Sequence, residues 1–419
     1  MKHAIQALAA LLTAAGGAAA QDVTLELTEV ITSPQRTETL QALVAEFEAE
    51  NPDVTVEITS LPWGQAFEIF ATTVSAGNTP DVVEMPDRWL ALYAANGALE
   101  SLEPWLAEWD ETETLTPRAL EMARFVDGTA YMIPYGFYLR AMFYHRPLLE
   151  EAGVESPPTT LEEFRAAAEA VSALPGKYGY CLRGGPGGLN GWMMFGATHA
   201  GSGEFFDESG ASTLDGEGWV GGIDYLAGLY RDGLAPPDSV SWGFNEIVAG
   251  FYSGTCALLD QDPDALIAIE ERMSPDDFGV VPFPKGPDGR AYPTIGYAGW
   301  AMFADGEHKE EARALIEHLS SRDANFRWNQ RIGALPIHEG VEDDPFFGQE
   351  KFAGWFESLG DADVVPLTMP TNLEEFAFFA DSLVPRTSQE LLLGRRTAED
   401  VAGEWAAYLT EANEAAANP

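Results

Sequence analysis

GTAYMIPYGFYLRAMFYHR, residues 128–146, is the stretch on which the fold depends. It is apolar and aromatic, but Pro134 and Gly136 interrupt it, so residues 126–131 and 139–144 are predicted to be strands. Because proline cannot donate a hydrogen bond to a sheet, we expect one strand to leave its sheet at Pro134. Two interpretations follow. The stretch is either a buried hairpin of one core, or a strand that passes between two domains with aromatic side chains exposed at the crossing.

The first 20 residues have the pattern of a secretory signal peptide. Lys2 precedes an alanine- and leucine-rich run that ends in three alanines before Gln21. The run is shorter than a membrane span, and no later stretch approaches the roughly 20 apolar residues that a span needs. No cysteine stands near the expected cleavage site at Ala20, which argues against a lipoprotein. We therefore expect a soluble protein exported to the periplasm.

Length and charge limit the possible architectures and partners. With 419 residues, the chain is long enough for two domains of about 150 residues or more. Its hydrophobic content of 46% is sufficient for sizeable cores. The formal net charge of −44 makes nucleic acid and anionic membranes poor partners.

Short apolar strands alternate with helices after residue 22. Strands are expected at residues 23–30, 54–58 and 81–85, with helices at 39–50 and 67–76 between them. This alternation predicts parallel α/β layering. Ligands of such sheets gather at the carboxyl ends of the strands, which here are residues 31–36, 60–64 and 86–89.

Two cysteines, Cys181 and Cys256, each lie in a strand-like run. A disulfide is favoured in an oxidising compartment if the two strands are neighbours, whereas two buried thiols are the alternative.

Catalytic motifs are absent from the sequence. No G-x-S-x-G, H-E-x-x-H or phosphate-binding Gly-Lys-Ser/Thr pattern occurs. A secreted glycoside hydrolase, which needs only two facing carboxylates, stays open as an alternative. A binder of a metal ion such as ferric iron is a further alternative, although the adjacent tyrosine pair of such proteins is missing.

Acidic residues around Pro263 partly match a calcium loop. Asp260, Asp262, Asp264 and Glu271 occupy positions 1, 3, 5 and 12 of that pattern, but position 6 is alanine instead of glycine. A simpler interpretation is a helix with Asp262 as N-cap and Pro263 as its first residue. We expect no bound metal and no cofactor.

Several segments, in order, resemble extracellular solute-binding proteins of the carbohydrate ABC-importer class. The segments are LVAEFEAENPDVTVEI (43–58), SAGNTPDVVEMPD (75–87), NGALESLEPWL (96–106), GTAYMIPYGFYLRAMFYHRPLLEEAG (128–153), PPTTLEEF (157–164), FYSGTCALLDQ (251–261), FGVVPFPKGPDG (278–289), KEEARALIEHLSS (309–321) and GALPI (333–337). The cysteines in YGYCLRG and GTCALL resemble a sugar- and polyol-binding subset, which further favours the disulfide.

The resemblance implies an α/β fold of the type II periplasmic-binding-protein kind, with two Rossmann-like lobes joined by three hinge crossings. The crossings would be residues 134–140, about 292–296, and 333–337. The first lobe would comprise residues 21–133 and 294–335, and the second residues 134–293 and 336–419. The implied function is capture of a carbohydrate in the cleft and delivery to a membrane permease. The protein would be a monomer without enzymatic activity, and its lobes would close about the hinge.

The candidate binding residues follow from the chemistry of a sugar. Its hydroxyls need carboxylates, amides and arginines, and its C–H faces need flat aromatic rings. Each candidate also has a structural interpretation, such as a helix cap for Asp87 or an interlobe ion pair for Arg140. The candidates are Arg36, Trp63, Asp87, Arg88, Tyr135, Phe137, Tyr138, Arg140, Trp192, Trp242, Asp260, Gln261, Tyr297 and Trp300. The remaining tryptophans of helical segments, Trp105, Trp109, Trp355 and Trp405, are assigned to packing.

Overall fold

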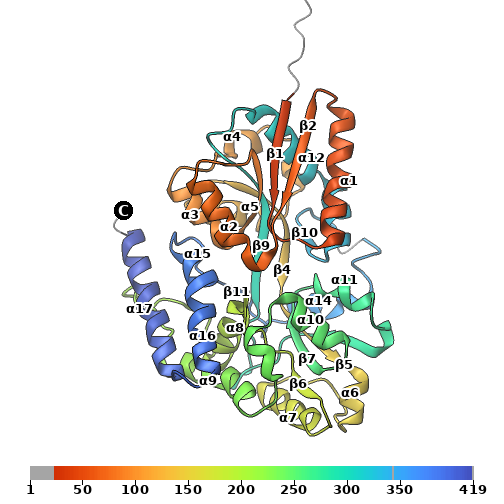
Figure 1. The fold of residues 1–419 in the computed structure, drawn as a ribbon, viewed down its shortest axis with the longest axis vertical. Coiled ribbons are helices and arrows are strands. Elements are labelled where there is room, and N and C mark those ends of the chain that lie inside the picture. Colours follow the sequence, from red (N-terminus) through yellow and green to blue (C-terminus); the bar gives the residue numbers. More distant parts are fainter. Residues whose placement is uncertain (1–22, 342–343, 418–419) are drawn as a thin grey trace, which may run out of the picture.

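Two β-sheets, each covered by helices, form two lobes that lie one above the other (Figure 1). The structure is a computed structural model and describes residues 23–341 and 344–417. The predicted signal peptide, residues 1–20, lies outside the described residues.

The first lobe contains the larger sheet, in the order β10-β4-β9-β3-β1-β2, with β11 paired to β9. β1 pairs in parallel with both β2 and β3, as the alternation of strands and helices predicts. β9 is antiparallel to both of its long neighbours, β3 and β4. The strands are β1 (Val23–Glu29), β2 (Val54–Ser60), β3 (Val82–Pro86), β4 (Met132–Leu139), β9 (Thr294–Met302), β10 (Leu335–Pro336) and β11 (Leu367–Thr368).

Three helices of the first lobe begin directly after the carboxyl ends of β1, β2 and β3. α1 (Pro34–Glu50) starts after Ser33, whose hydroxyl accepts a hydrogen bond from the Arg36 N–H, and proline occupies its first position. Its apolar side chains at helical spacing are buried against the sheet. The other helices of this lobe are α2 (Trp63–Ser75), α3 (Asp87–Ala95), α4 (Glu103–Leu106), α5 (Pro117–Ala123), α12 (Lys309–Ser320) and α13 (Arg322–Ile332).

The second lobe contains the smaller sheet, in the order β6-β7-β5-β8. Its strands are β5 (Ala141–His145), β6 (Tyr178–Tyr180), β7 (Cys256–Gln261) and β8 (Phe278–Val281). Its helices are α6 (Arg146–Glu151), α7 (Leu161–Ser172), α8 (Leu189–Ala200), α9 (Glu217–Arg231), α10 (Phe244–Tyr252), α11 (Ala265–Glu270) and α14 (Ala353–Gly360).

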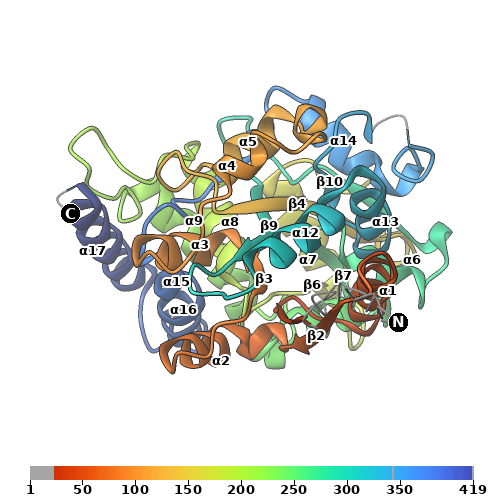
Figure 2. The same ribbon diagram turned by 90° about the horizontal axis from the view of Figure 1, so that it is seen from above.

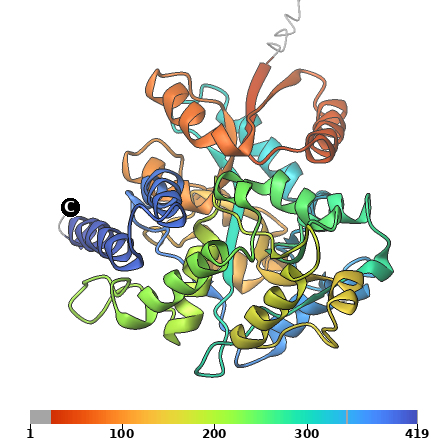
Figure 3. The same cartoon turned by 60° about the horizontal axis from the view of Figure 1, so that its bottom comes forward.

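The C-terminal helices lie along one side of the molecule (Figures 2 and 3). α15 (Phe376–Phe378) leads into a π-helical turn, Phe379–Leu383, and then into α16 (Val384–Leu392) and α17 (Ala398–Ala417). α16 and α17 pack on α9 of the second lobe, whereas α15 contacts α3 of the first lobe. None of the helices within the described ranges combines the length and apolarity needed to cross a bilayer.

The crossing between the lobes differs in detail from the prediction. Residues 126–131 form a turn instead of a strand, and β4 continues through Pro134 up to Leu139. A β-bulge between Pro134 and Gly136 accommodates the proline within the ladder to β9. The chain leaves the first sheet at Arg140 and enters the second at β5. The expected exit at Pro134 was therefore wrong, and so was the interpretation as a hairpin of one core.

Gly136 is required where the third crossing meets the first. Leu335 and Pro336 of β10 pair with Phe137 and Gly136 of β4. A Cβ atom at Gly136 would lie 2.5 Å from Asn329 Oδ1 and 2.9 Å from the Ala334 Cβ atom. A larger residue would push the two crossings apart.

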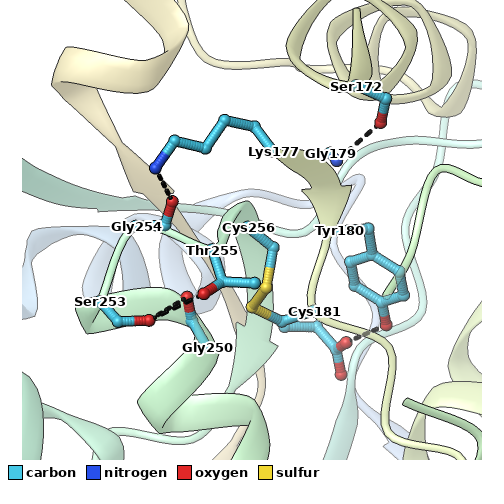
Figure 4. Close-up of a disulfide and its surroundings, with 11 residues drawn as sticks. Ser172, Lys177, Gly179, Tyr180, Cys181, Gly250, Ser253, Gly254, Thr255 and Cys256 are labelled. Carbon is cyan, nitrogen blue, oxygen red and sulfur yellow. Dashed lines mark hydrogen bonds between the residues drawn. A yellow bond between two sulfur atoms is a disulfide. The ribbon is translucent and has the colours of Figure 1, made fainter. Parts of the chain in front are cut away.

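The disulfide between Cys181 and Cys256 is confirmed, with the Cα atoms 5.5 Å apart (Figure 4). It links Cys181, which directly follows β6, to Cys256, the first residue of the neighbouring parallel strand β7. It therefore fixes the start of the Arg183 loop relative to β7, whose far end reaches the cleft.

Candidate functional site

Arg36 anchors a buried polar cluster at the carboxyl end of the first sheet. Its Nη2 donates to Glu84 Oε1 at 2.6 Å and to the Tyr135 hydroxyl at 2.9 Å. Its Nη1 lies 3.3 Å from the Tyr138 hydroxyl. Glu84 is fully buried on β3 and also accepts backbone hydrogen bonds from Val30 and Ile31. The cluster holds Tyr138, which is partly exposed, in a fixed orientation at the cleft.

Trp63, Asp87 and Arg88 lie together at the starts of α2 and α3. The Arg88 guanidinium lies 5.2 Å from the centre of the Trp63 ring, which itself stacks on Trp89 at 5.8 Å. Asp87 is buried and accepts backbone hydrogen bonds from Arg88 at 2.7 Å and Tyr297 at 3.3 Å. Burial raises the pKa of Asp87 to about 6, although the neighbouring Arg88 lowers it.

Arg140 organises the floor of the cleft on the side of the second lobe. Its Nη1 donates to the carboxylate of Asp260 at 2.7 Å and to the Asp260 carbonyl at 3.0 Å. Its Nη2 lies 3.6 Å from the Asp262 carboxylate. The Tyr180 hydroxyl donates to the other oxygen of Asp260. This network fixes the end of β7 against the first crossing.

Arg183 stands at the start of a glycine-rich loop between β6 and α8. Its Nε donates to the Pro186 carbonyl at 2.7 Å, and its guanidinium lies 6.0 Å from the Phe244 ring. Burial lowers the pKa of Arg183 to about 9, and the nearby charges of Arg140 and Arg88 lower it further.

Asp264 completes the charged lining opposite Arg36. Burial raises the pKa of Asp264 to about 7, and the neighbouring Asp262 contributes in the same direction. Arg36, Arg140 and Arg183 oppose that rise. The Asp264 carboxyl therefore holds its proton more tightly than an exposed aspartate does.

Contacts across the cleft bring the lobes together. Gln35 Nε2 of α1 donates to Glu271 Oε1, at the end of α11, over 2.9 Å. Pro186 of the second lobe lies 3.8 Å from where a Cβ atom would stand on Gly64 of α2. A small cavity of about 10 Å³ behind the loop, lined by Arg140, Tyr180, Arg183 and Asp260, has room for one water molecule.

Several residues of the cleft region carry buried polar atoms without partners. Among residues 23–341 and 344–417, the buried atoms Arg88 Nε, Arg140 Nε, Arg183 Nη2 and Asp264 Oδ1 make no hydrogen bond. Three are donors and one is a carboxyl oxygen, and they come from both lobes. Leaving such groups unpaired is costly, so a hydrogen-bonding ligand or water is expected there. A solute with several hydroxyls can serve both kinds of atom, and the Trp63 ring can cover an apolar face.

The structure does not bring every candidate to the cleft. Phe137 and Tyr297 pair across β4 and β9 and pack on each other at 6.5 Å, on the sheet face opposite Tyr138. Trp300 is buried against Tyr135 and Trp328 in the core of the first lobe. Trp192 is buried against Trp405 in the core of the second. These four side chains pack within the lobes.

Trp242, Gln261 and Asp262 take supporting positions. Trp242 is half-buried and lies against Gly250 of α10. The Gln261 side chain accepts a hydrogen bond from the Asp262 N–H at 3.1 Å and is almost fully buried. Asp262 is not the N-cap of α11, which begins at Ala265; the Asp262 carboxylate faces Arg140 instead. No group of three or more His, Cys, Asp or Glu side chains in the described part of the chain is arranged to hold a metal ion.

Sequence reasoning missed four polar residues of the cleft region: Glu84, Arg183, Asp264 and Asp381. Glu84 stands in an otherwise apolar strand, and an acidic residue inside such a run was the available signal. Asp264 was considered only as part of a calcium pattern. Asp381 is 293 residues from its partner Arg88, so no local pattern connects them.

Two α/β lobes, three chain crossings and a polar cleft beside the partly exposed Trp63 define a two-lobed solute-binding protein. Residues 33–326 match the family model described as bacterial extracellular solute-binding protein, and the chain belongs to that family. The predicted fold class and family are thereby confirmed.

Relatives and solved structures agree with this assignment. A putative binding protein of Brucella abortus is 28% identical over 324 residues, which cover 77% of this chain and 78% of the relative. A mannitol-binding protein of Pseudomonas aeruginosa is 30% identical over 224 residues, or 52% of this chain and 50% of the relative. Maltose-bound T. maritima MalE3 superposes with a TM-score of 0.82 at 24% identity, covering 92% of this chain and 99% of that one. A chitin oligosaccharide binding protein gives 0.83 at 22% identity, covering 94% and 99%. At these identities the superpositions show a shared fold.

Proposed function

We propose that the protein is the substrate-binding component of an ABC importer and captures a carbohydrate: a sugar, an oligosaccharide or a polyol. The observation that carries the proposal is the set of unpaired polar atoms on Arg88, Arg140, Arg183 and Asp264, which belong to both lobes, together with the Trp63 ring beside the Arg88 guanidinium. Hydroxyl groups both donate and accept, so a carbohydrate matches this mixture of donors and an acceptor. The names of the mannitol-binding and chitin oligosaccharide binding relatives agree with that class of ligand.

The hinge provides the mechanism. Three short crossings join the lobes, and the cleft residues come from both sides of them. Ligand binding closes the lobes because the solute makes more hydrogen bonds when both sides reach it. Contacts such as Gln35 to Glu271 then join the rims of the cleft. The closed form presents the solute to a membrane permease, which a separate ATPase drives.

Localisation and organisation complete the proposal. The protein is exported to the periplasm by the signal peptide at residues 1–20, is cleaved near Ala20 and is not a lipoprotein. It acts as a monomer and binds no nucleic acid. The first lobe comprises residues 21–139 with 294–335, and the second comprises residues 140–293 with 336–419. The boundary at the first crossing moves from the expected residue 134 to Arg140, because β4 stays in the first sheet up to Leu139.

The protein acts without catalysis. Its family and fold are those of transport binding proteins. The carboxylates of Asp260 and Asp262 face Arg140, and Asp381 faces Arg88, so they are held as ion-pair partners. A glycoside hydrolase would instead need one carboxylate poised as acid and another free to attack.

A ligand screen tests the proposal. The mature protein is titrated with mannitol, maltose, chitobiose and related sugars, and each ligand that binds the folded state raises the melting temperature. We expect at least one carbohydrate to bind and none to be cleaved, as judged by chromatography of the incubated sugar.

The Trp63→Ala variant tests the site itself. It should raise the Kd of the bound carbohydrate by roughly tenfold or more, because aromatic contacts dominate many binding sites. Trp109→Ala is the matched control, since Trp109 is also half-buried and stacks on a second tryptophan, Trp105, at 5.2 Å. Absence of binding by all carbohydrates, or turnover of a glycoside, would overturn the proposal.

A further inference from the structure

Asp381 connects the C-terminal helices to the cleft of the first lobe. Its Oδ2 accepts a hydrogen bond from Trp89 Nε1 at 2.7 Å, and its Oδ1 lies 3.3 Å from Arg88 Nη1. Both partners are on α3, whereas Asp381 lies in the turn that precedes α16. The contact therefore joins α3 to helices that pack on the second lobe.

The local backbone at Asp381 is unusual. Residues Phe379–Leu383 form a π-helical turn between α15 and α16. Such turns widen the helix by one residue and occur frequently at functional sites. Here Phe379 packs on Trp405 and Tyr408 of α17, so the turn is held firmly against the C-terminal helix.

The ion pair determines where the Arg88 guanidinium lies. Arg88 is 10% exposed and Asp381 14% exposed in their side chains, so the pair is only slightly screened by solvent. With Nη1 held by Asp381, the guanidinium stays 5.2 Å from the Trp63 ring centre. The Nε of Arg88 then remains without a partner in the cleft region. Asp381 accepts from the guanidinium and so fixes its orientation, whereas the Trp63 ring beside it offers no hydrogen-bond acceptor.

We propose that Asp381 is a positioning residue of the solute site, which holds Arg88 against Trp63 and makes this placement depend on docking of the C-terminal helices onto α3. The inference rests on the proposed function, because Arg88 and Trp63 are taken as solute contacts. Asp381 itself acts through Arg88. Binding thereby becomes coupled to the contact between the lobes.

A second polar contact along the same helix supplies a matched control. Asn96, at the end of α3, donates to Glu374 Oε1 at 3.1 Å. This contact also joins α3 to the C-terminal segment, but neither residue contacts Arg88 or Trp63. Substitution of Glu374 therefore weakens the contact between α3 and the C-terminal segment without removing the partner of the Arg88 guanidinium.

The experiment compares D381N and E374Q with the wild type, using the carbohydrate that binds most tightly in the screen. Calorimetry gives Kd, and thermal unfolding without solute gives Tm. We expect D381N to raise Kd by roughly tenfold, because it removes the charged partner but keeps an oxygen for Trp89. E374Q should leave Kd unchanged. In an R88Q background, D381N should have no further effect on Kd, which a merely structural role would not produce.

Several outcomes decide against the inference. The inference fails if D381N binds with the wild-type Kd, or if D381N and E374Q weaken binding equally. It also fails if D381N weakens binding as much in the R88Q background as in the wild type. In each case the proposed function stands. If D381N has no cooperative thermal transition, D381S takes its place, because it also removes the carboxylate, and unchanged Kd there overturns the inference equally. If the wild type binds no carbohydrate, the proposed function and this inference fail together.

Discussion

Arg140 and Asp260 form a buried ion pair at the point where the chain leaves the first sheet. Arg140 Nη1 lies 2.7 Å from the Asp260 carboxylate, and the side chains are 3% and 5% exposed. Asp260 ends β7 of the second lobe, and Arg140 follows β4 of the first. The pair therefore joins the hinge to the floor of the cleft.

Loss of Arg140 should destabilise the protein strongly. Arg140→Ala leaves the carboxylates of Asp260 and Asp262 without their cation in a buried site, which typically costs about 3–5 kcal/mol of unfolding free energy. Urea unfolding measures the loss. Arg231→Ala removes an exposed pair with Asp224 and is the control, with an expected change of about 0–1 kcal/mol. Similar losses in the two variants would contradict the prediction.

Tyr138 and Phe137 should have opposite roles although they are adjacent. Tyr138 lies on the cleft face with Arg36, whereas Phe137 packs on Tyr297 on the other face. Tyr138→Ala should weaken solute binding by about 1–2 kcal/mol, roughly tenfold in Kd. Phe137→Ala should instead lower the unfolding free energy by about 3–5 kcal/mol and leave Kd near the wild-type value. Calorimetry and urea unfolding on both variants distinguish the two roles, and a larger binding loss in Phe137→Ala would refute this assignment.

The bulge in β4 separates Phe137 from the other two aromatic candidates of this strand. Tyr135, Phe137 and Tyr138 were all expected at the pocket, and in a regular strand Tyr135 and Phe137 would point to the same face. The bulge between Pro134 and Gly136 adds one residue, which moves every later side chain to the other face. Tyr138 consequently joins Tyr135 on the side of Arg36, with their hydroxyls 3.0 Å apart. Which residue bulges depends on the pairing with β9, and a single sequence does not contain that information.

Local patterns predicted the features that depend on local physics. The start of α1 after Ser33 and the alternation of strands and helices could be predicted, because each arises within a short segment. The pairs Arg36 with Glu84 and Arg88 with Asp381 were not readable, since they form only when distant segments meet. With 67 acidic and 23 basic residues, each base has several possible acidic partners, so composition does not indicate which acid pairs with which base.

The disulfide should contribute substantially to stability. Cys181 and Cys256 are 75 residues apart, so the bond restricts a long loop of the unfolded chain. Replacement of both cysteines by serine should lower the unfolding free energy by about 2–4 kcal/mol. Urea unfolding with and without reductant measures this effect. The double variant should be insensitive to reductant, and a wild type that is equally insensitive would contradict the prediction.

Asp87 should make stability fall as the pH rises through its folded-state pKa. That pKa is raised from 3.8 to about 6, first by burial and also by Asp381, while Arg88 opposes the rise. The folded state therefore holds the proton more tightly than the unfolded state, so the stabilisation is complete below about pH 4 and is lost as the pH passes 6. A difference of about two pKa units corresponds to roughly 3 kcal/mol. The asparagine of the Asp87→Asn variant cannot ionise. The contributions of the other carboxylates to the pH dependence of stability cancel when the variant and the wild type are compared at the same pH. Urea unfolding at each pH measures the difference in unfolding free energy between Asp87→Asn and the wild type. We expect this difference to shift in favour of the variant by roughly 3 kcal/mol between pH 4 and 7. A constant difference would show that Asp87 keeps its ordinary pKa in the folded protein.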